Sequence, residues 1–150
     1  MYVNGLTFLT TVSKHILYRT SFFIPTREIP DIMTGLDKVM TLYKQAGFKV
    51  TTIYGDKEFK PLEDIIFQKY HSTLNCSCAQ EHVPKAKNNN KVIKERTRAA
   101  YYSLPFKAIT KTMTKYLVMD ATKKLIFFPT RWNFQVLQSP YDTTLQTSRL

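Results

Sequence analysis

The stretch PDIMTGLDKVMTLYKQAGFKVTTIYGD, residues 30–56, decides the fold class. Its apolar residues recur at helical spacing, at Ile32, Leu36, Val39, Met40 and Tyr43, which predicts an amphipathic helix. Gly47 stands where a left-handed helix end is expected, and residues 50–54 (VTTIY) predict a short buried strand. A helix that leads into such a strand is typical of a βαβ crossover with parallel strands, so the stretch predicts an α/β fold.

The residues before this stretch predict antiparallel strands. Runs rich in β-branched and aromatic residues occupy 6–12 and 16–24, and the turn dipeptide Asn4-Gly5 precedes the first run, so residues 1–3 can end a further strand. The same patterns predict four later elements: a helix over 61–70, a strand over 72–76, a basic helix over 83–104 and a helix over 109–128.

The length and composition favour one folded domain. The chain has 150 residues, of which 43% are hydrophobic and 13% aromatic, and this argues against disorder. We expect a single domain over 1–135 and an irregular tail over 136–150, where Thr, Gln and Ser are frequent. No apolar run is long enough to span a bilayer, and Cys76 and Cys78 are too close for a disulfide framework. These features predict an intracellular protein, nuclear or cytoplasmic, without a membrane partner.

Positive charge is concentrated in the second half of the chain. The formal net charge is +11, and residues 81–150 carry thirteen basic and four acidic side chains against nine and seven in residues 1–80. Within the basic helix, four cations fall on one face at spacings of four, three and four: Lys87, Lys91, Lys94 and Arg98. Such a stripe indicates a polyanion partner, and an ordinary solvated helix face is the alternative.

Several motifs, in order along the chain, resemble the integrase core of copia-type retrotransposons. They are MYVNG (1–5), YKQAGFKVTTI (43–53), GDKEF (55–59), EHVP (81–84), VIKERTRA (92–99) and SLPFKA (103–108). The resemblance implies a ribonuclease H-like α/β fold, with a mixed sheet of antiparallel opening strands plus a parallel strand, flanked by helices. It also implies DNA as a sequence-indifferent partner, homo-oligomers, and a part in DNA integration.

By the same resemblance, two Asp and one Glu would hold two Mg²⁺ or Mn²⁺ ions for strand transfer. Asp56 matches the second Asp of the family, so it is the expected metal-binding and catalytic carboxylate. The family's first Asp would precede Met1, and Lys87 stands where the family has its Glu, which replaces a ligand by a cation. We therefore expect a domain that is catalytically inactive, with the metal weakly bound or absent, and that binds DNA through Lys87, Lys91, Lys94, Arg96 and Arg98.

Other readings of the sequence stay open. The missing carboxylates could come from a longer precursor, another chain or Glu81, which would make an active metal-dependent nuclease, or the chain could be a decayed, non-functional reading frame. His71, Cys76, Cys78 and His82 form a weaker zinc candidate, because Cys-x-Cys is not the usual knuckle spacing. Asn90 falls on the expected buried stripe of the basic helix, where an amide without partners would destabilise the fold by about 1–3 kcal/mol.

Overall fold

The computed structural model describes residues 1–76 and 83–127 and shows a mixed α/β fold built on two separate sheets. Strands β1 (Tyr2–Val3), β2 (Leu6–Val12) and β3 (Arg19–Ile24) form an antiparallel sheet in the order β1-β2-β3. Strands β4 (Thr52–Tyr54) and β5 (Thr73–Asn75) form a parallel pair. The strands expected from the sequence are therefore present, but the single mixed sheet is divided into two in the described residues.

The division into two sheets corrects the predicted crossover, in which the helix before β4 was expected to join two parallel strands. The α1 helix (Ile29–Gln45) leads from β3 to β4, but β4 pairs with β5 and not with an opening strand. The parallel crossover is instead made by the two helical segments between β4 and β5, since the chain must return across the sheet to start a parallel strand. Sequence periodicity identified the strands but not which strand lies beside which.

Turn residues set the hairpin of the first sheet. Asn4 and Gly5 both have positive φ, 46° and 77°, as a two-residue type I′ turn requires. The next strand begins at Arg19 rather than Ile16, and Leu17 between them has a left-handed φ of 53°. A leucine in this conformation interrupts the extended backbone, so residues 16–18 do not continue the strand.

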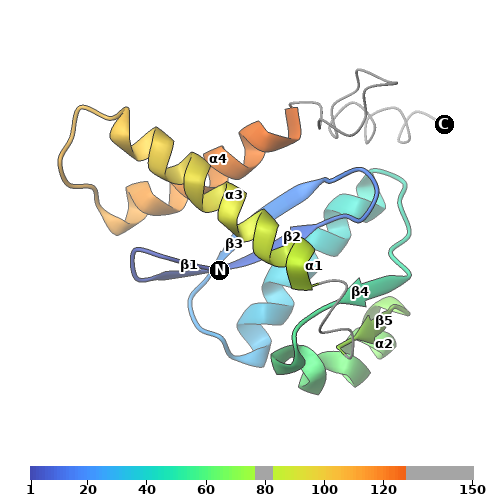
Figure 1. Cartoon of the computed structure of the whole chain (residues 1–150). Coiled ribbons are helices and arrows are strands. Elements are labelled where there is room, and N and C mark those ends of the chain that lie inside the picture. The colour runs from blue at the N-terminus through green and yellow to red at the C-terminus, as the bar shows by residue number, and fades with distance from the viewer. Residues whose placement is uncertain (77–82, 128–150) are drawn as a thin grey trace.

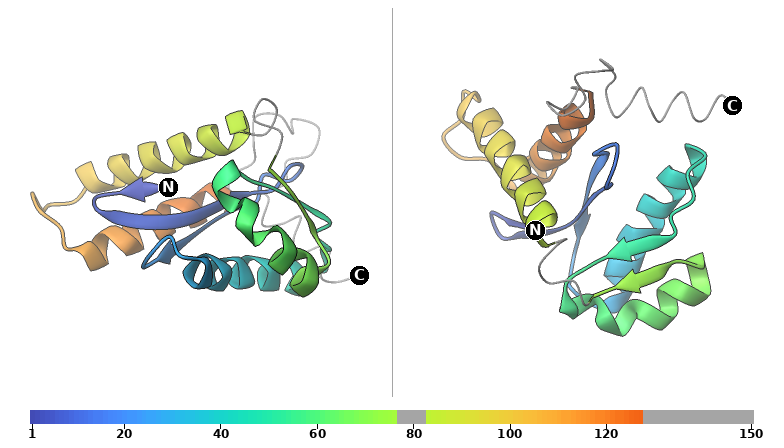
Figure 2. Two further views of the ribbon diagram at one scale, coloured as in Figure 1. Left: turned by 90° about the horizontal axis from the view of Figure 1, so that it is seen from below. Right: turned by 45° about the vertical axis from the view of Figure 1, so that its right-hand side comes forward.

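Helices cover both faces of the antiparallel sheet. The α1 helix (Ile29–Gln45) contacts β2 and β3 from one side, while α3 (Val83–Tyr102) contacts β2 and α4 (Lys111–Phe127) contacts β3. Figures 1 and 2 show α3 and α4 together on one side of the sheet, and α1 with the small parallel sheet on the other. A short 3₁₀ turn η1 (Lys57–Leu62) and α2 (Glu63–Tyr70) complete the fold beside β5.

The core is divided in the same way as the sheets. One cluster joins α1, η1, α2 and β5 through Met33, Leu36, Leu62, Ile66 and Leu74. The other joins the first sheet to α3 and α4 through Leu6, Phe8, Ile93 and Val118. Leu9 of β2 packs against the first cluster while Phe8 belongs to the second, because successive strand residues point to opposite faces. The expected tail 136–150, and with it the boundary at residue 135, lies outside the described residues.

Candidate nucleic-acid interface

The α3 helix is fixed to the sheet by a narrow buried face. Ile93 is fully buried, and Asn89 and Thr97 are 4% and 5% exposed. Asn89 accepts a hydrogen bond from Arg19 Nε at 3.0 Å, and Asn90 accepts one from Thr10 Oγ1 at 2.7 Å. The expectation of an unsatisfied amide at Asn90 is therefore wrong: the residue is half-buried, and a strand hydroxyl supplies its partner.

With that face buried, the predicted cationic stripe of α3 lies at the surface. Lys87, Lys91 and Arg98 are exposed and Lys94 is half-buried. All four cations line one surface recess on α3, together with Asn90 and Glu95. Within residues 1–76 and 83–127, the ion pair of this stripe joins Lys91 Nζ to Glu95 Oε1 at 4.0 Å, and both side chains are more than half exposed. A pair this long and exposed neutralises little charge, so the stripe keeps a positive field.

Arg96 does not share this recess. It follows Lys87 by nine residues, which at about 100° per residue places it roughly half a turn away around the helix. The buried residues Ile93 and Thr97 lie between the two directions. One flat ligand on the stripe therefore reaches four of the five basic residues predicted from the sequence, and Arg96 faces a different direction.

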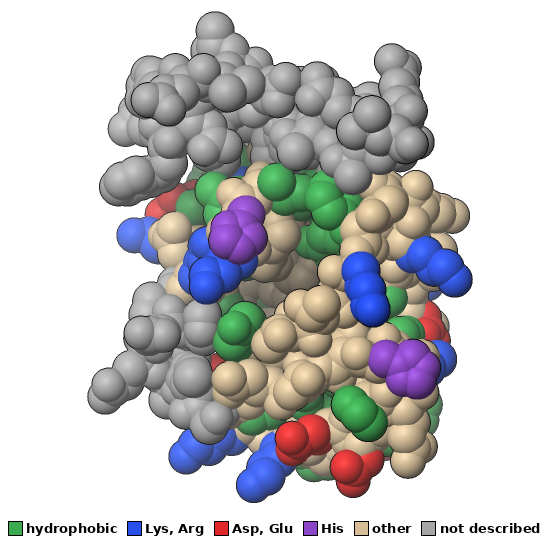
Figure 3. All heavy atoms as spheres, turned by 90° about the vertical axis from the view of Figure 1, so that its right-hand side faces the viewer, with side chains coloured by type: hydrophobic (Ala, Val, Ile, Leu, Met, Phe, Trp, Pro, Cys, Tyr) green, Lys and Arg blue, Asp and Glu red, His purple; other side chains and the backbone are tan. Residues whose placement is uncertain are grey.

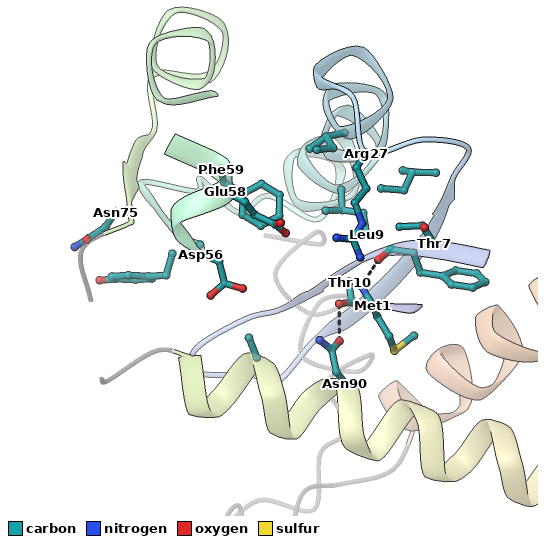
Figure 4. Close-up of a pocket in the computed structure, with 16 residues that line it drawn as sticks. Met1, Thr7, Leu9, Thr10, Arg27, Asp56, Glu58, Phe59, Asn75 and Asn90 are labelled. Carbon is teal, nitrogen blue, oxygen red and sulfur yellow. Dashed lines mark hydrogen bonds between the residues drawn. The ribbon is translucent and has the colours of Figure 1, made fainter. Parts of the chain in front are cut away.

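Asp56 borders a separate cavity of about 210 Å³ between the two sheets. It lies two residues after the end of β4 and directly before η1, whose first turn is closed by the bond from Phe59 N–H to Asp56 C=O at 3.0 Å. Its carboxylate makes no capping bond to η1, and Figure 4 shows it directed into the open space between η1 and α3. The predicted position at the end of a parallel strand is thus what the structure has.

The α3 residues that line this cavity are Ala86 and Asn90, whereas Lys87 lines the neighbouring recess. Among the described residues, two acidic side chains, Asp56 and Glu58, line the cavity, and Glu81 lies outside those residues. In residues 1–76 and 83–127 no group of three or more His, Cys, Asp or Glu side chains could hold a metal ion. A two-metal centre needs more oxygen ligands than two carboxylates on one short segment supply, so the donors within the described residues do not fit by themselves the pair of ions that the resemblance implies.

Arg27 adds a cation that sequence reasoning missed. It lies in the loop before α1, lines the cavity opposite Asp56, and points towards Met1 and Thr10 (Figure 4). Burial lowers the pKa of the Met1 ammonium group, and the positive charges of Arg27 and Lys94 lower it further. The negative charge of Glu58, which also lines the cavity, opposes the two cations and raises the same pKa. No motif marks Arg27, because its place at the cavity depends on the packing of segments that are distant in the sequence.

The zinc candidate is only partly within the described residues. His71 ends α2 in a left-handed conformation, and Cys76 is a free, half-buried thiol whose pKa is raised by burial. Cys78 and His82 lie outside the described residues. None of the helices in the described part of the chain is both long and apolar enough to cross a membrane.

The face of the molecule seen in Figure 3 contrasts with the stripe on α3. Basic side chains there are scattered among neutral and apolar surface, with acidic side chains near the lower edge. The basic side chains on this face do not form a regular row like the one on α3.

Comparison with known proteins adds no family to this picture. No protein-family model matches the chain, and no match was found among curated proteins or solved structures. A functional assignment therefore has to come from the chain's own residues and their geometry.

Proposed function

We propose that this chain is an integrase-like domain that binds duplex nucleic acid, without sequence preference, through the α3 stripe Lys87, Lys91, Lys94 and Arg98. The observation that carries the proposal is that these four cations share one surface recess and that, in the part of the chain that the structure describes, they make a single long ion pair. Phosphates along a duplex would neutralise such a row, and the release of condensed counterions drives that binding. Arg96 is left out of the contact set because of its direction on the helix.

The motifs that resemble copia-type integrase cores support DNA, and a link to DNA integration, as the biological setting. Asp56 at the end of β4 agrees with that resemblance in position. Lys87 in place of the family's Glu, and the two-carboxylate donor set at the cavity, favour binding without strand transfer. Any Mg²⁺ or Mn²⁺ at Asp56 would then be held weakly, and the chain would act as a DNA-binding component.

Salt dependence tests the proposal directly. With four phosphate contacts, affinity for a labelled duplex should fall roughly a hundredfold between about 50 and 200 mM salt. The variant Lys91→Gln/Arg98→Gln should bind more weakly and reduce the slope of log affinity against log salt by about two. Strand cleavage, read from the same gel in the presence of Mn²⁺, should be absent.

A matched control is Lys111→Gln/Lys123→Gln, which removes the same charge from exposed positions of α4. This control should keep most of the salt slope. Equal losses in both variants would mean that net charge and not the stripe drives binding. Cleavage that needs metal and is abolished by Asp56→Asn would contradict the proposal of a catalytically inactive domain and would favour a nuclease.

A further inference from the structure

The C-terminal end of α3 carries exposed aromatic side chains. Tyr102, the last residue of the helix, is 80% exposed, and Phe106 in the following loop is 55% exposed. Figures 1 and 2 show this end of α3 on the side of the molecule away from β4 and β5. Single exposed aromatic residues are common on protein surfaces and need no explanation by themselves. What distinguishes Tyr102 is its position relative to the α3 stripe.

Tyr102 continues the α3 stripe by one helical turn. It follows Arg98, the last cation of the stripe, by four residues, and side chains at this spacing are neighbours on a helix surface. With about 100° and 1.5 Å per residue, Tyr102 lies roughly 40° from Arg98 around the helix and about 6 Å further along its axis. A polymer whose phosphates follow the stripe from Lys87 to Arg98 therefore meets an aromatic ring at the next turn.

The neighbouring tyrosine, Tyr101, supports this ring. Its hydroxyl donates a hydrogen bond to Lys107 C=O at 2.7 Å, which ties the loop after α3 back to the helix. The Tyr101 ring lies edge-on to the Tyr102 ring, with centroids 5.5 Å apart and an angle of 65° between the planes. Tyr101 is half-buried and serves the fold, whereas the Tyr102 ring keeps most of its surface in solvent.

An exposed ring beside a row of cations matches the chemistry of a nucleic acid with unpaired bases. The phosphates supply negative charge for the cations, and unpaired bases stack on aromatic side chains. Inside a duplex, neighbouring base pairs cover the faces of each base, so an intact duplex would contact the cations and leave the tyrosine unused. A base becomes available to Tyr102 where a duplex opens or continues as a single strand.

We propose that Tyr102 is a stacking site for an unpaired base of a nucleic acid whose duplex part lies along the α3 stripe. This inference rests on the proposed duplex binding and adds to it a preference for a junction between duplex and single strand. The row of cations beside the ring favours such an anionic ligand over an apolar protein surface. The exposed Lys107 adds a further cation at this end of α3.

The test compares two labelled nucleic acids that share one duplex and differ in its end. One carries a short single-stranded overhang of deoxyadenosines, and the other carries an abasic overhang of equal length, which has the same phosphates but no bases. Each overhang is tested on either strand. We expect the overhang with bases to bind at least about fivefold more tightly than the abasic one, since stacking of a single base on an aromatic ring supplies that factor or more.

Three variants assign the effect to the ring. Tyr102→Ala should abolish the difference between the two overhangs and keep the salt slope for blunt duplex, which the α3 stripe sets. Tyr102→Phe keeps the ring and should keep the difference. The matched control Tyr116→Ala removes another exposed ring, 68% exposed on α4, and should also keep it. An unchanged midpoint of thermal unfolding shows that each variant is folded.

Four results would overturn the stacking site, and they separate it from the proposed function. Equal affinity for the two overhangs, with the expected salt slope for blunt duplex, would overturn the stacking site and leave duplex binding intact. A difference that persists in Tyr102→Ala would place the bases elsewhere. A dimer of the chain, seen by sedimentation, that Tyr102→Ala dissociates would assign the ring to a second copy. A blunt duplex that does not bind through the stripe would overturn the proposed function, and the stacking site with it.

Discussion

At the residue scale, the two neighbouring asparagines of α3 show how burial and hydrogen bonding depend on partners that sequence spacing does not specify. Helical spacing placed Asn90 on the buried stripe, but Asn89 is the more buried of the two. Each accepts a hydrogen bond from a residue at least 70 positions away, Arg19 or Thr10. Helical spacing therefore located the buried face of α3 to within one residue. The hydrogen-bond donors that compensate the burial of the two amides come from the sheet.

The Thr10–Asn90 bond gives a prediction for a double-mutant cycle. Thr10→Val and Asn90→Ala each remove one partner of a 2.7 Å bond and should lower the free energy of unfolding by about 0.5–1.5 kcal/mol. The double variant should lose less than the sum of the two, since the bond is already absent after the first change. Urea denaturation measures all four corners, and strictly additive losses would mean that the bond contributes nothing.

Asp37 supports a prediction about pH. Hydrogen bonds donated by Lys69, with Nζ 2.7 Å from Oδ2, and by the Tyr70 hydroxyl lower the pKa of its carboxyl. Because the folded-state pKa lies below the ordinary value, the stabilisation is present above the ordinary carboxyl pKa and is lost as pH falls through the folded-state pKa. Both charged side chains are over two-fifths exposed, which limits the contribution to about 0.2–1 kcal/mol.

The variant Asp37→Asn should therefore be less stable than the parent chain near neutral pH and equal to it in strong acid. Urea denaturation across the acid range measures the difference. Tyr70→Phe, which keeps the ring and removes one donor, should lose part of the same increment. A difference between Asp37→Asn and the parent that persists unchanged in strong acid would point to a packing effect instead.

At the scale of elements, the helices were predicted best and the strands less well. The ends of α3 and α4 agree with the sequence prediction to within about two residues at each end, because a 3.6-residue period over some twenty residues is a strong signal. The β4 and β5 strands have three residues each, too few for alternation to define their pairing. The separation of β4 from the first sheet was not predictable for that reason.

The contact between α1 and the first sheet gives a prediction at this scale. A Cβ on Gly35 would lie 2.9 Å from Leu9 Cδ2 and 3.4 Å from Ile24 Cγ2. The Leu9 methyl can move towards the cavity that it lines, and alanine favours the helix by up to about 1 kcal/mol over glycine. We expect Gly35→Ala to change the free energy of unfolding by less than about 1 kcal/mol.

Gly35→Val should behave differently, because its two branches cannot both avoid Leu9 and Ile24. Overpacking of this kind costs about 1–3 kcal/mol. Chemical denaturation of both variants checks the pair. A large loss for Gly35→Ala would show that Leu9 cannot shift, and equal stability of Gly35→Val and the parent would show that α1 is not held close to the sheet.

At the scale of the whole molecule, the sequence predicted an α/β fold with a basic helix but not how the two halves meet. The charge excess and its place on α3 follow from composition and period, and Asp56 was placed correctly after a parallel strand. The cavity between the sheets, with Arg27 across from Asp56, comes from contacts between segments that no local pattern links. The candidate site was therefore predictable on α3 and unpredictable around the cavity.

The division into two sheets and two core clusters predicts uneven stability across the molecule. Ile66 is 1% exposed in the cluster of α1, α2 and β5, and truncation to alanine should cost about 2–5 kcal/mol there. Strands of three residues open more easily than the longer strands of the antiparallel sheet. In Ile66→Ala, the amides of Gly55 and Thr73, which bond across β4 and β5, should exchange faster, while those of Leu9 and Thr11, which lie opposite β3, should change little.

The matched control is Val118→Ala in the other cluster, which should accelerate exchange of the Leu9 and Thr11 amides. Native-state hydrogen exchange by NMR measures both variants, and equal acceleration at all four amides in Ile66→Ala would mean that the two clusters unfold as one cooperative unit.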